Sequence, residues 1–187
     1  MVVHCRSKAQ AQVVRNAIAS RLAECGLELH PDKTRLVYCK DSSRSGSFEH
    51  EQFTFLGYTF RPRLAKSRAG RYFVSFSPAV SRDALTRIRR TIRAWRIHRR
   101  SDLTFAEIVA HINTYVTGWV AYYGRFYKSV LYAAFRGLNV YLMRWAMRKY
   151  KSLNHSRKRA WAWLGNMEQR APEMFAHWRF GVTVSSH

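Results

Sequence analysis

The chain has 187 residues, of which 33 are Lys or Arg and 11 are Asp or Glu, so its formal net charge is +22 at pH 7. Unpaired charges are rarely buried, so this excess lies largely on the surface and attracts polyanions, with nucleic acid as the leading partner. The three scattered cysteines fit neither a disulfide framework nor a paired zinc site. No apolar run approaches the roughly 20 residues that span a bilayer. We therefore expect a cytoplasmic, nucleic-acid-binding protein without a membrane partner.

The first part of the chain, residues 1–77, has the pattern of one helix mixed with short strands. Ser7 is suited to cap a helix that ends near Cys25, where Gly26 provides a stop. A polar, Ser-rich loop follows between Asp41 and Glu51. Runs of β-branched and aromatic residues between turn residues predict strands at 2–5, 27–29, 34–39 and 71–76, with a basic loop at 61–70. The segment 53–60, which contains Gly57, is predicted to form either one aromatic-rich strand or a tight hairpin.

From Pro78 onward the pattern becomes helical, so we expect a second domain at 78–187 and an α+β fold class. Apolar residues recur at helical spacing, and Thr104 with Glu107 has the spacing of a capping box. The expected helices run from Ser81 to about Arg100, from Thr104 past Trp119, from about Lys128 to Tyr150, and around Ser156 to Leu164; the tail from Ala171 is not assigned.

Arginines and lysines gather along these helices and predict the RNA-binding surface. Acidic neighbours are scarce, and none occurs between Glu107 and Glu168, which favours phosphate contact over a solvated charged face. One ridge, on a face separate from the apolar stripe of the first helix, consists of Arg82, Arg89, Arg93, Arg96 and Arg100. Further candidates are Arg125, Lys128, Arg144, Arg148, Lys149, Arg157, Lys158 and Arg159.

Aromatic side chains alternate with these basic residues, a composition that suits folded or single-stranded RNA because unpaired bases stack on aromatic rings. Trp119, Phe135 and Trp145 lie on apolar stripes, so we expect them in the core. For the tyrosines both a core role and a stacking role stay open: Tyr123, Tyr127 and Tyr150.

The sequence contains no recognisable catalytic or metal-binding constellation. Two-metal phosphoryl chemistry needs carboxylates held close together, and no Asp-Asp or Asp-x-Asp pair occurs. The eight histidines show no ligand spacing with Cys or Glu. We therefore predict neither catalytic residues nor a metal site, and no cofactor for this chain.

The order of several motifs resembles a group II intron reverse transcriptase/maturase. Gly26-Leu27, then Pro31-Asp32-Lys33-Thr34, then Phe55-Leu56-Gly57-Tyr58 is similar to the second half of a reverse transcriptase palm. The segment from Tyr115 to Tyr123, which includes Gly118-Trp119 and Tyr122-Tyr123, is similar to the maturase-specific domain. The resemblance implies a truncated palm over 1–77, followed by a helical thumb or X domain over 78–187.

The resemblance also implies roles for particular residues. Lys33 matches a lysine near the phosphates of the incoming nucleotide, an accessory role in an intact enzyme. Phe55, Leu56, Gly57 and Tyr58 match the primer grip, and Gly118, Trp119, Tyr122 and Tyr123 match the maturase motif. From the residues alone, Gly57 could equally mark only a tight bend, and Gly118 only a close helix contact. The implied partners are group II intron RNA and a template–primer duplex.

One departure from the family decides between activities. Relatives carry Tyr-Ala-Asp-Asp directly before the segment aligned with residues 2–5, and here Met1 stands at that boundary. The metal-binding aspartates, which hold Mg²⁺ in the intact polymerase family, are therefore expected to be missing. We expect an RNA-binding maturase fragment that assists splicing and has no polymerase activity alone. The alternatives are one half of a split RNA-directed DNA polymerase, completed in trans by an N-terminal fragment, or a non-functional remnant of a mobile genetic element.

Overall fold

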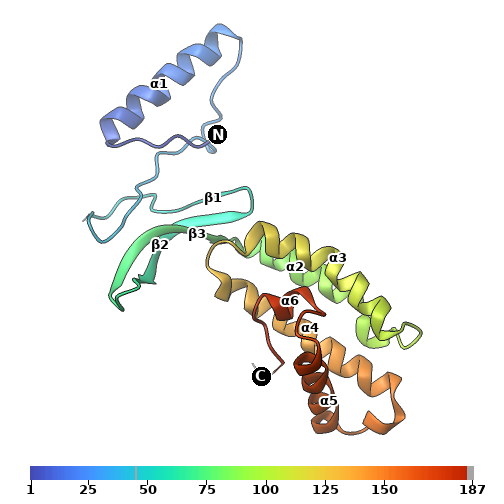
Figure 1. Cartoon of the computed structure of the whole chain (residues 1–187). Helices are drawn as coiled ribbons and strands as arrows, with labels where there is room; N and C mark the ends of the chain where they lie inside the picture. Colours follow the sequence, from blue (N-terminus) through green and yellow to red (C-terminus); the bar gives the residue numbers. More distant parts are fainter. Residues whose placement is uncertain (45, 185–187) are drawn as a thin grey trace. The chain divides into compact units, whose positions relative to one another are not determined.

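A computed structural model describes residues 1–44 and 46–184 of the protein (Figure 1). Helices and strands are both present, with the helices concentrated in the C-terminal half, so the expected α+β class is confirmed. The chain forms two compact units that alternate along the sequence. The first unit consists of residues 1–53 and 60–77, and the second of residues 54–59 and 78–187.

The helix of the first unit, α1 (Lys8–Glu24), begins and ends as its sequence predicts. The Ser7 hydroxyl accepts a hydrogen bond from the Gln10 N–H at 3.2 Å, and Gly26 adopts a φ of +69° just beyond the helix. None of its side chains is buried, and Val13 is exposed. Most helices in proteins are stabilised by burying an apolar face, so α1 depends mainly on its own backbone hydrogen bonds.

Three strands form one sheet in the order β1 (Phe53–Phe55), β2 (Tyr58–Lys66), β3 (Tyr72–Val80). The strands predicted at 2–5, 27–29 and 34–39 do not form, because no neighbouring strand pairs with them and an isolated strand is not stable in water. The basic loop predicted at 61–70 is also wrong over most of its length. Residues 61–66 pair within β2, which leaves a short turn before β3.

The second unit is built around α4 (Lys128–Lys149), which contacts α2 (Arg82–Ala94), α5 (Arg157–Arg170) and two short 3-10 helices, η1 (Ile97–Arg99) and η2 (Lys151–Leu153). The remaining helices, α3 (Phe105–Tyr123) and α6 (Ala176–Arg179), contact each other (Figure 1). Their inward faces form one core, whose largest fully buried side chains include Trp145, Phe135, Phe175, Ile108, Ile112, Leu131, Leu138, Leu142 and Met143.

The first helix of this core is shorter than the sequence predicts. It begins at the Ser81 cap, whose hydroxyl accepts from the Ala84 N–H at 3.1 Å, but it ends at Ala94 instead of near Arg100. Arg96 adopts a left-handed φ of +49°, which redirects the chain into η1. This change of direction buries Ile97, an apolar gain that local helical periodicity does not reveal.

The C-terminal tail, which has no clear pattern in the sequence, is held against α4 by a buried polar cluster. The side-chain oxygen of Asn139 lies 2.9 Å from His177 Nε2 and accepts from Trp178 Nε1 at 3.0 Å. The Asn139 amide nitrogen donates to the Thr183 carbonyl at 3.2 Å. Burial lowers the His177 pKa to about 3, so this imidazole is neutral at physiological pH.

Candidate nucleic-acid interface

The arginine ridge predicted from the sequence divides into two parts in the structure. Arg82, Arg89 and Arg93 lie exposed on α2, while Arg96 and Arg100 lie beyond its end. The exposed part of α2 is more basic than the ridge alone, because two further arginines that the sequence analysis overlooked are also exposed: Arg87 and Arg90. The absence of neighbouring acids could have identified both, since Asp83 is the sole acidic residue of the helix.

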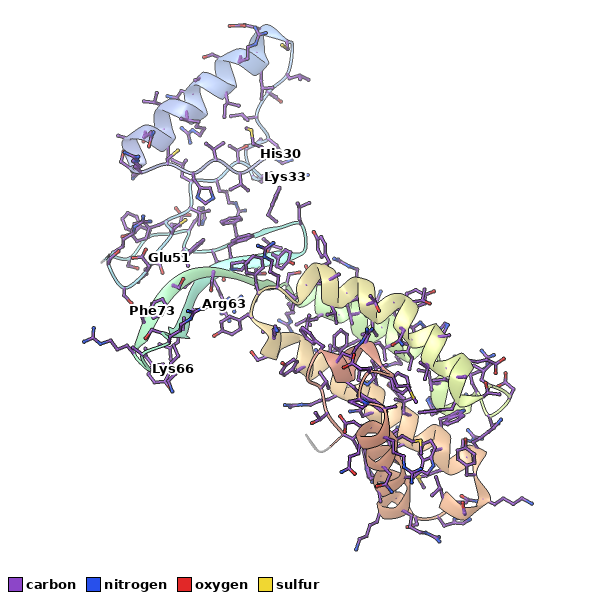
Figure 2. All side chains as sticks on the ribbon, viewed as in Figure 1. His30, Lys33, Glu51, Arg63, Lys66 and Phe73 are labelled. Atoms are coloured by element: carbon purple, nitrogen blue, oxygen red, sulfur yellow. The ribbon has the colours of Figure 1, made fainter. Side chains whose placement is uncertain are left out.

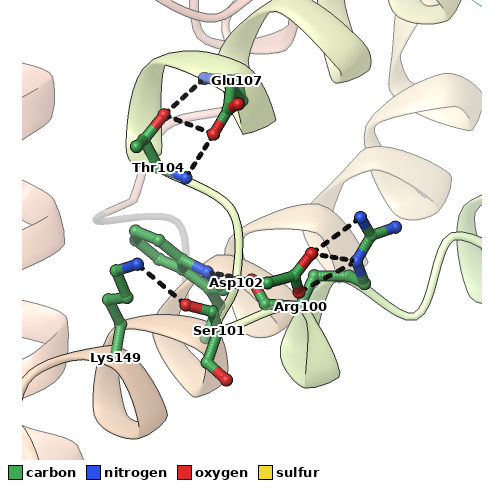
Figure 3. A network of polar contacts seen from close by, with 7 residues as sticks. Arg100, Ser101, Asp102, Thr104, Glu107 and Lys149 are labelled. Atoms are coloured by element: carbon green, nitrogen blue, oxygen red, sulfur yellow. Dashed lines mark hydrogen bonds and ion pairs between the residues drawn. The ribbon is translucent and has the colours of Figure 1, made fainter.

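Arg100 differs from the other ridge arginines because it is paired (Figure 3). Its guanidinium donates to both carboxylate oxygens of Asp102 at 2.9–3.1 Å, and this hydrogen bonding lowers the Asp102 pKa. The Lys149 ammonium donates to the Ser101 carbonyl at 2.8 Å. Trp145 Nε1 donates to the Arg100 carbonyl at 2.9 Å. The positive charges of Arg100 and Lys149 therefore help to order the loop before α3.

The same loop ends in the predicted capping box, which is confirmed (Figure 3). The Glu107 carboxylate accepts from the Thr104 N–H at 2.7 Å, and the Glu107 N–H donates to the Thr104 hydroxyl at 3.3 Å. The Thr104 N–H and the Thr104 hydroxyl both donate to the Glu107 carboxylate, and these two bonds lower the Glu107 pKa. The cap fixes where α3 begins and hence which of its residues face the core.

Two motifs that are far apart in the sequence meet in the second unit. The turn between β1 and β2 consists of Leu56 and Gly57, which both have positive φ, at +49° and +79°. The Tyr122 hydroxyl at the end of α3 donates to the Leu56 carbonyl at 3.0 Å, and the Tyr58 hydroxyl donates to the Tyr122 carbonyl. A Cβ on Gly57 would lie 2.6 Å from the Tyr123 hydroxyl oxygen. Gly57 therefore serves both a tight turn and a close approach.

This contact leaves apolar and aromatic side chains open to solvent. Leu56 is 67% exposed, and Tyr122 and Phe126 are 49% and 42% exposed. The exposed Arg125 guanidinium lies 5.9 Å from the centre of the Phe126 ring. We use the name aromatic patch for six exposed residues: Phe55, Leu56, Tyr122, Arg125, Phe126 and Tyr127. An exposed aromatic surface beside a cation suits stacking against unpaired bases.

The aromatic residues expected in the core are largely there. Phe135 and Trp145 are fully buried, and the half-buried Trp119 stacks against Trp95 with ring centres 5.7 Å apart. The half-buried Tyr123 and Tyr150 pack against the core, whereas Tyr127 is exposed. Gly118 is exposed, and a Cβ there would meet no atom within 4 Å, so the close-packing interpretation of this glycine is wrong.

A second basic surface covers the end of α4 and the start of α5. Arg144 and Arg148 lie one helical turn apart on α4 and are exposed. Arg157, Lys158 and Arg159, in the first turn of α5, are exposed as well. Lys128, at the opposite end of α4, is also exposed and lies 5.6 Å from the centre of the Phe180 ring.

In the first unit, Lys33 lies exposed in the turn at residues 31–33 (Figure 2). Its assignment as an accessory polymerase residue stays a prediction. Among residues 1–44 and 46–184, no group of three or more His, Cys, Asp or Glu side chains is placed to hold a metal ion. Over the same residues, no helix is long and apolar enough to cross a membrane.

The second unit thus joins a helical core to exposed arginines and aromatic rings on α2, α3 and α4. Residues 85–163 are similar to the group II intron, maturase-specific domain. This match indicates a maturase domain and a role in group II intron splicing, with intron RNA as the implied partner. No curated protein and no solved structure matches the chain.

The maturase-like segment, residues 85–163, covers most of α2, all of α3 and α4, and the first half of α5. It includes the predicted maturase motif around Gly118 and most of the predicted RNA-binding residues. Arg82, Lys33 and the Phe55–Tyr58 motif lie outside it. The palm and primer-grip assignments therefore stay predictions.

Proposed function

We propose that this protein is an RNA-binding maturase that stabilises folded group II intron RNA and does not polymerise DNA by itself. In this role the protein contributes binding energy, and the RNA carries out the splicing chemistry. No cofactor is needed by this chain for that role. The reverse transcriptase palm over residues 1–77, and Mg²⁺ as a cofactor of an intact polymerase, belong to the same proposal.

The observation that carries the proposal is the coincidence of two surfaces on the second unit. The exposed arginines of α2 offer planar, bidentate donors to phosphates. The aromatic patch offers ring faces to unpaired bases, which folded RNA exposes in loops and bulges. A purely electrostatic DNA-binding surface would have no use for the exposed rings of Tyr122 and Phe126.

Binding of a labelled group II intron RNA, compared with an unrelated folded RNA of equal length, tests the proposal. Affinity is measured by fluorescence anisotropy over a series of salt concentrations. We expect the intron RNA to bind more tightly, with the difference preserved as salt rises, because base stacking is screened less than phosphate contact. Equal affinities at every salt concentration would leave only nonspecific polyanion binding.

Two charge-matched variants locate the interface. Arg93→Gln removes an exposed α2 arginine, and we expect it to weaken binding and to lower the slope of log affinity against log salt by about 0.7–0.9 per lost phosphate contact. Arg100→Gln removes the same charge from the arginine paired with Asp102, and its effect should be smaller. A larger loss in Arg100→Gln would contradict the assignment of the interface to α2.

A further inference from the structure

A small open pocket lies on the second unit, away from the maturase motif in the sequence. It has a volume of about 270 Å³ and is lined by His98 of η1, by Arg144, Met147 and Arg148 of α4, and by Asn154 after η2. Contacts between α4 and both 3-10 helices hold these elements together. Arg144, Arg148 and Asn154 are exposed, so a ligand can reach the pocket from solvent.

One polar atom of the pocket-lining residues lacks a partner within the described part of the chain. His98 Nδ1 is buried and makes no hydrogen bond to residues 1–44 or 46–184. The imidazole ring stacks on Tyr141, with ring centres 5.5 Å apart and planes inclined by 22°. A buried polar atom without a partner costs free energy, and a bound ligand would remove that cost.

The charged side chains that act on His98 are all arginines. In order of influence they are Arg99, Arg144, Arg148 and Arg96, two from η1 and its cap and two from α4. Together with burial, which is the largest cause, they lower the His98 pKa below its ordinary value of 6.5. At neutral pH the lowered pKa favours the neutral form of His98, in a pocket that Arg144 and Arg148 also line.

We propose that this pocket binds a phosphate group of RNA between Arg144 and Arg148, with His98 and Asn154 as additional hydrogen-bonding groups. The two guanidiniums supply charge-assisted donors, which are the strongest partners of a phosphate. The pocket deepens the proposed function and rests on it, because it assigns one defined phosphate site within the RNA-binding surface. Residues 98, 144, 148 and 154 all fall within the maturase-like segment.

This site makes RNA binding depend on pH. A phosphate in the pocket offsets the repulsion from the arginines and raises the His98 pKa, so binding takes up a proton. Affinity therefore increases as pH falls from neutrality through the pKa of His98 in the complex. The gain is up to about tenfold for each unit by which the bound phosphate raises that pKa.

The test measures affinity of the full chain for labelled group II intron RNA between pH 5.5 and 7.5, at constant ionic strength. The variants are Arg144→Gln, Arg148→Gln and His98→Gln, with Arg170→Gln, an exposed arginine of α5 outside the pocket, as the charge-matched control. We expect both pocket arginine variants to lose at least several-fold more affinity than the control, and His98→Gln to lose the pH-dependent part.

Direct observation of the imidazole supports or refutes the site independently of the RNA. Inorganic phosphate, added to the wild-type chain, should shift the NMR resonances of His98 and raise its titration midpoint, and Arg144→Gln should abolish both changes. If the wild type binds RNA while pocket variants match the control and His98 ignores phosphate, the pocket is wrong but the proposed function survives. If the wild type fails to bind RNA at low salt, the proposed function fails first.

Discussion

The buried imidazole of His177 should make the second unit unstable in mild acid. Its Nε2 faces the Asn139 side-chain oxygen, which also accepts from Trp178. The Asn139 oxygen can only accept, so Nε2 carries the proton. The unprotonated Nδ1 is buried, and none of the residues that the structure describes donates a hydrogen bond to it. Protonating Nδ1 would place a charge in an apolar site beside the Phe175 ring, which lies 5.3 Å from the imidazole centre to centre.

The magnitude follows from the shift in pKa. The folded value of about 3 lies below the ordinary value of 6.5, so the unfolded chain binds the proton more readily than the folded chain. Stability is then complete above pH 6.5 and is lost as pH falls toward 3, by roughly 1.4 kcal/mol for each pH unit within that window. Between pH 7 and pH 5 the loss amounts to about 2 kcal/mol.

Urea unfolding followed by tryptophan fluorescence measures this loss in the second unit alone, because all six tryptophans lie between residues 95 and 178. His177→Gln keeps a side-chain donor for Asn139 but cannot titrate. It should be less stable than the wild type at pH 7. Between pH 7 and pH 5, however, its free energy of unfolding should fall by about 2 kcal/mol less than that of the wild type. Equal pH dependence in the two proteins would refute the reasoning.

Two other predictions concern backbone positions of the second unit, with the same fluorescence assay. Gly57→Ala should destabilise this unit by about 1–3 kcal/mol, because Gly57 has a positive φ and lies close to Tyr123. Gly118→Ala should stabilise the unit by about 0.5–1 kcal/mol, because alanine favours a helix and a Cβ there meets no other atom. A loss of stability in Gly118→Ala would reveal a packing role that the structure does not show. Thr104→Ala removes the hydroxyl of the capping box with Glu107 and should cost about 1 kcal/mol; an unchanged unfolding midpoint would show that the cap does not limit stability.

Local signals in the sequence predicted the helices of this protein well. Ser7, Ser81 and Thr104 act as caps because a side-chain hydroxyl reaches backbone N–H groups only two or three residues away. Apolar spacing placed Phe135 and Trp145 in the core for a similarly local reason. Strands were predicted less well, because a strand needs a partner, and residues 2–5 and 34–39 have the composition without the partner.

The candidate interface depended partly on tertiary structure. Charge alone indicated a polyanion as partner. Because the chain has 33 basic and 11 acidic residues, it keeps a large positive net charge in any fold. Which basic residues are paired was decided by how the chain folds. Arg93 is exposed on α2, while Arg100 meets Asp102 after an unforeseen change of direction at Arg96.

The sequence by itself therefore determined the helical second unit, its caps and core, and the polycationic character of the protein. Only the tertiary structure decided that Gly57 and Tyr123 meet, and that His98 shares a pocket with Arg144. The reason is physical: helical periodicity and capping act over a few residues, whereas these contacts join side chains 46 to 66 positions apart, whose meeting depends on how the whole core packs.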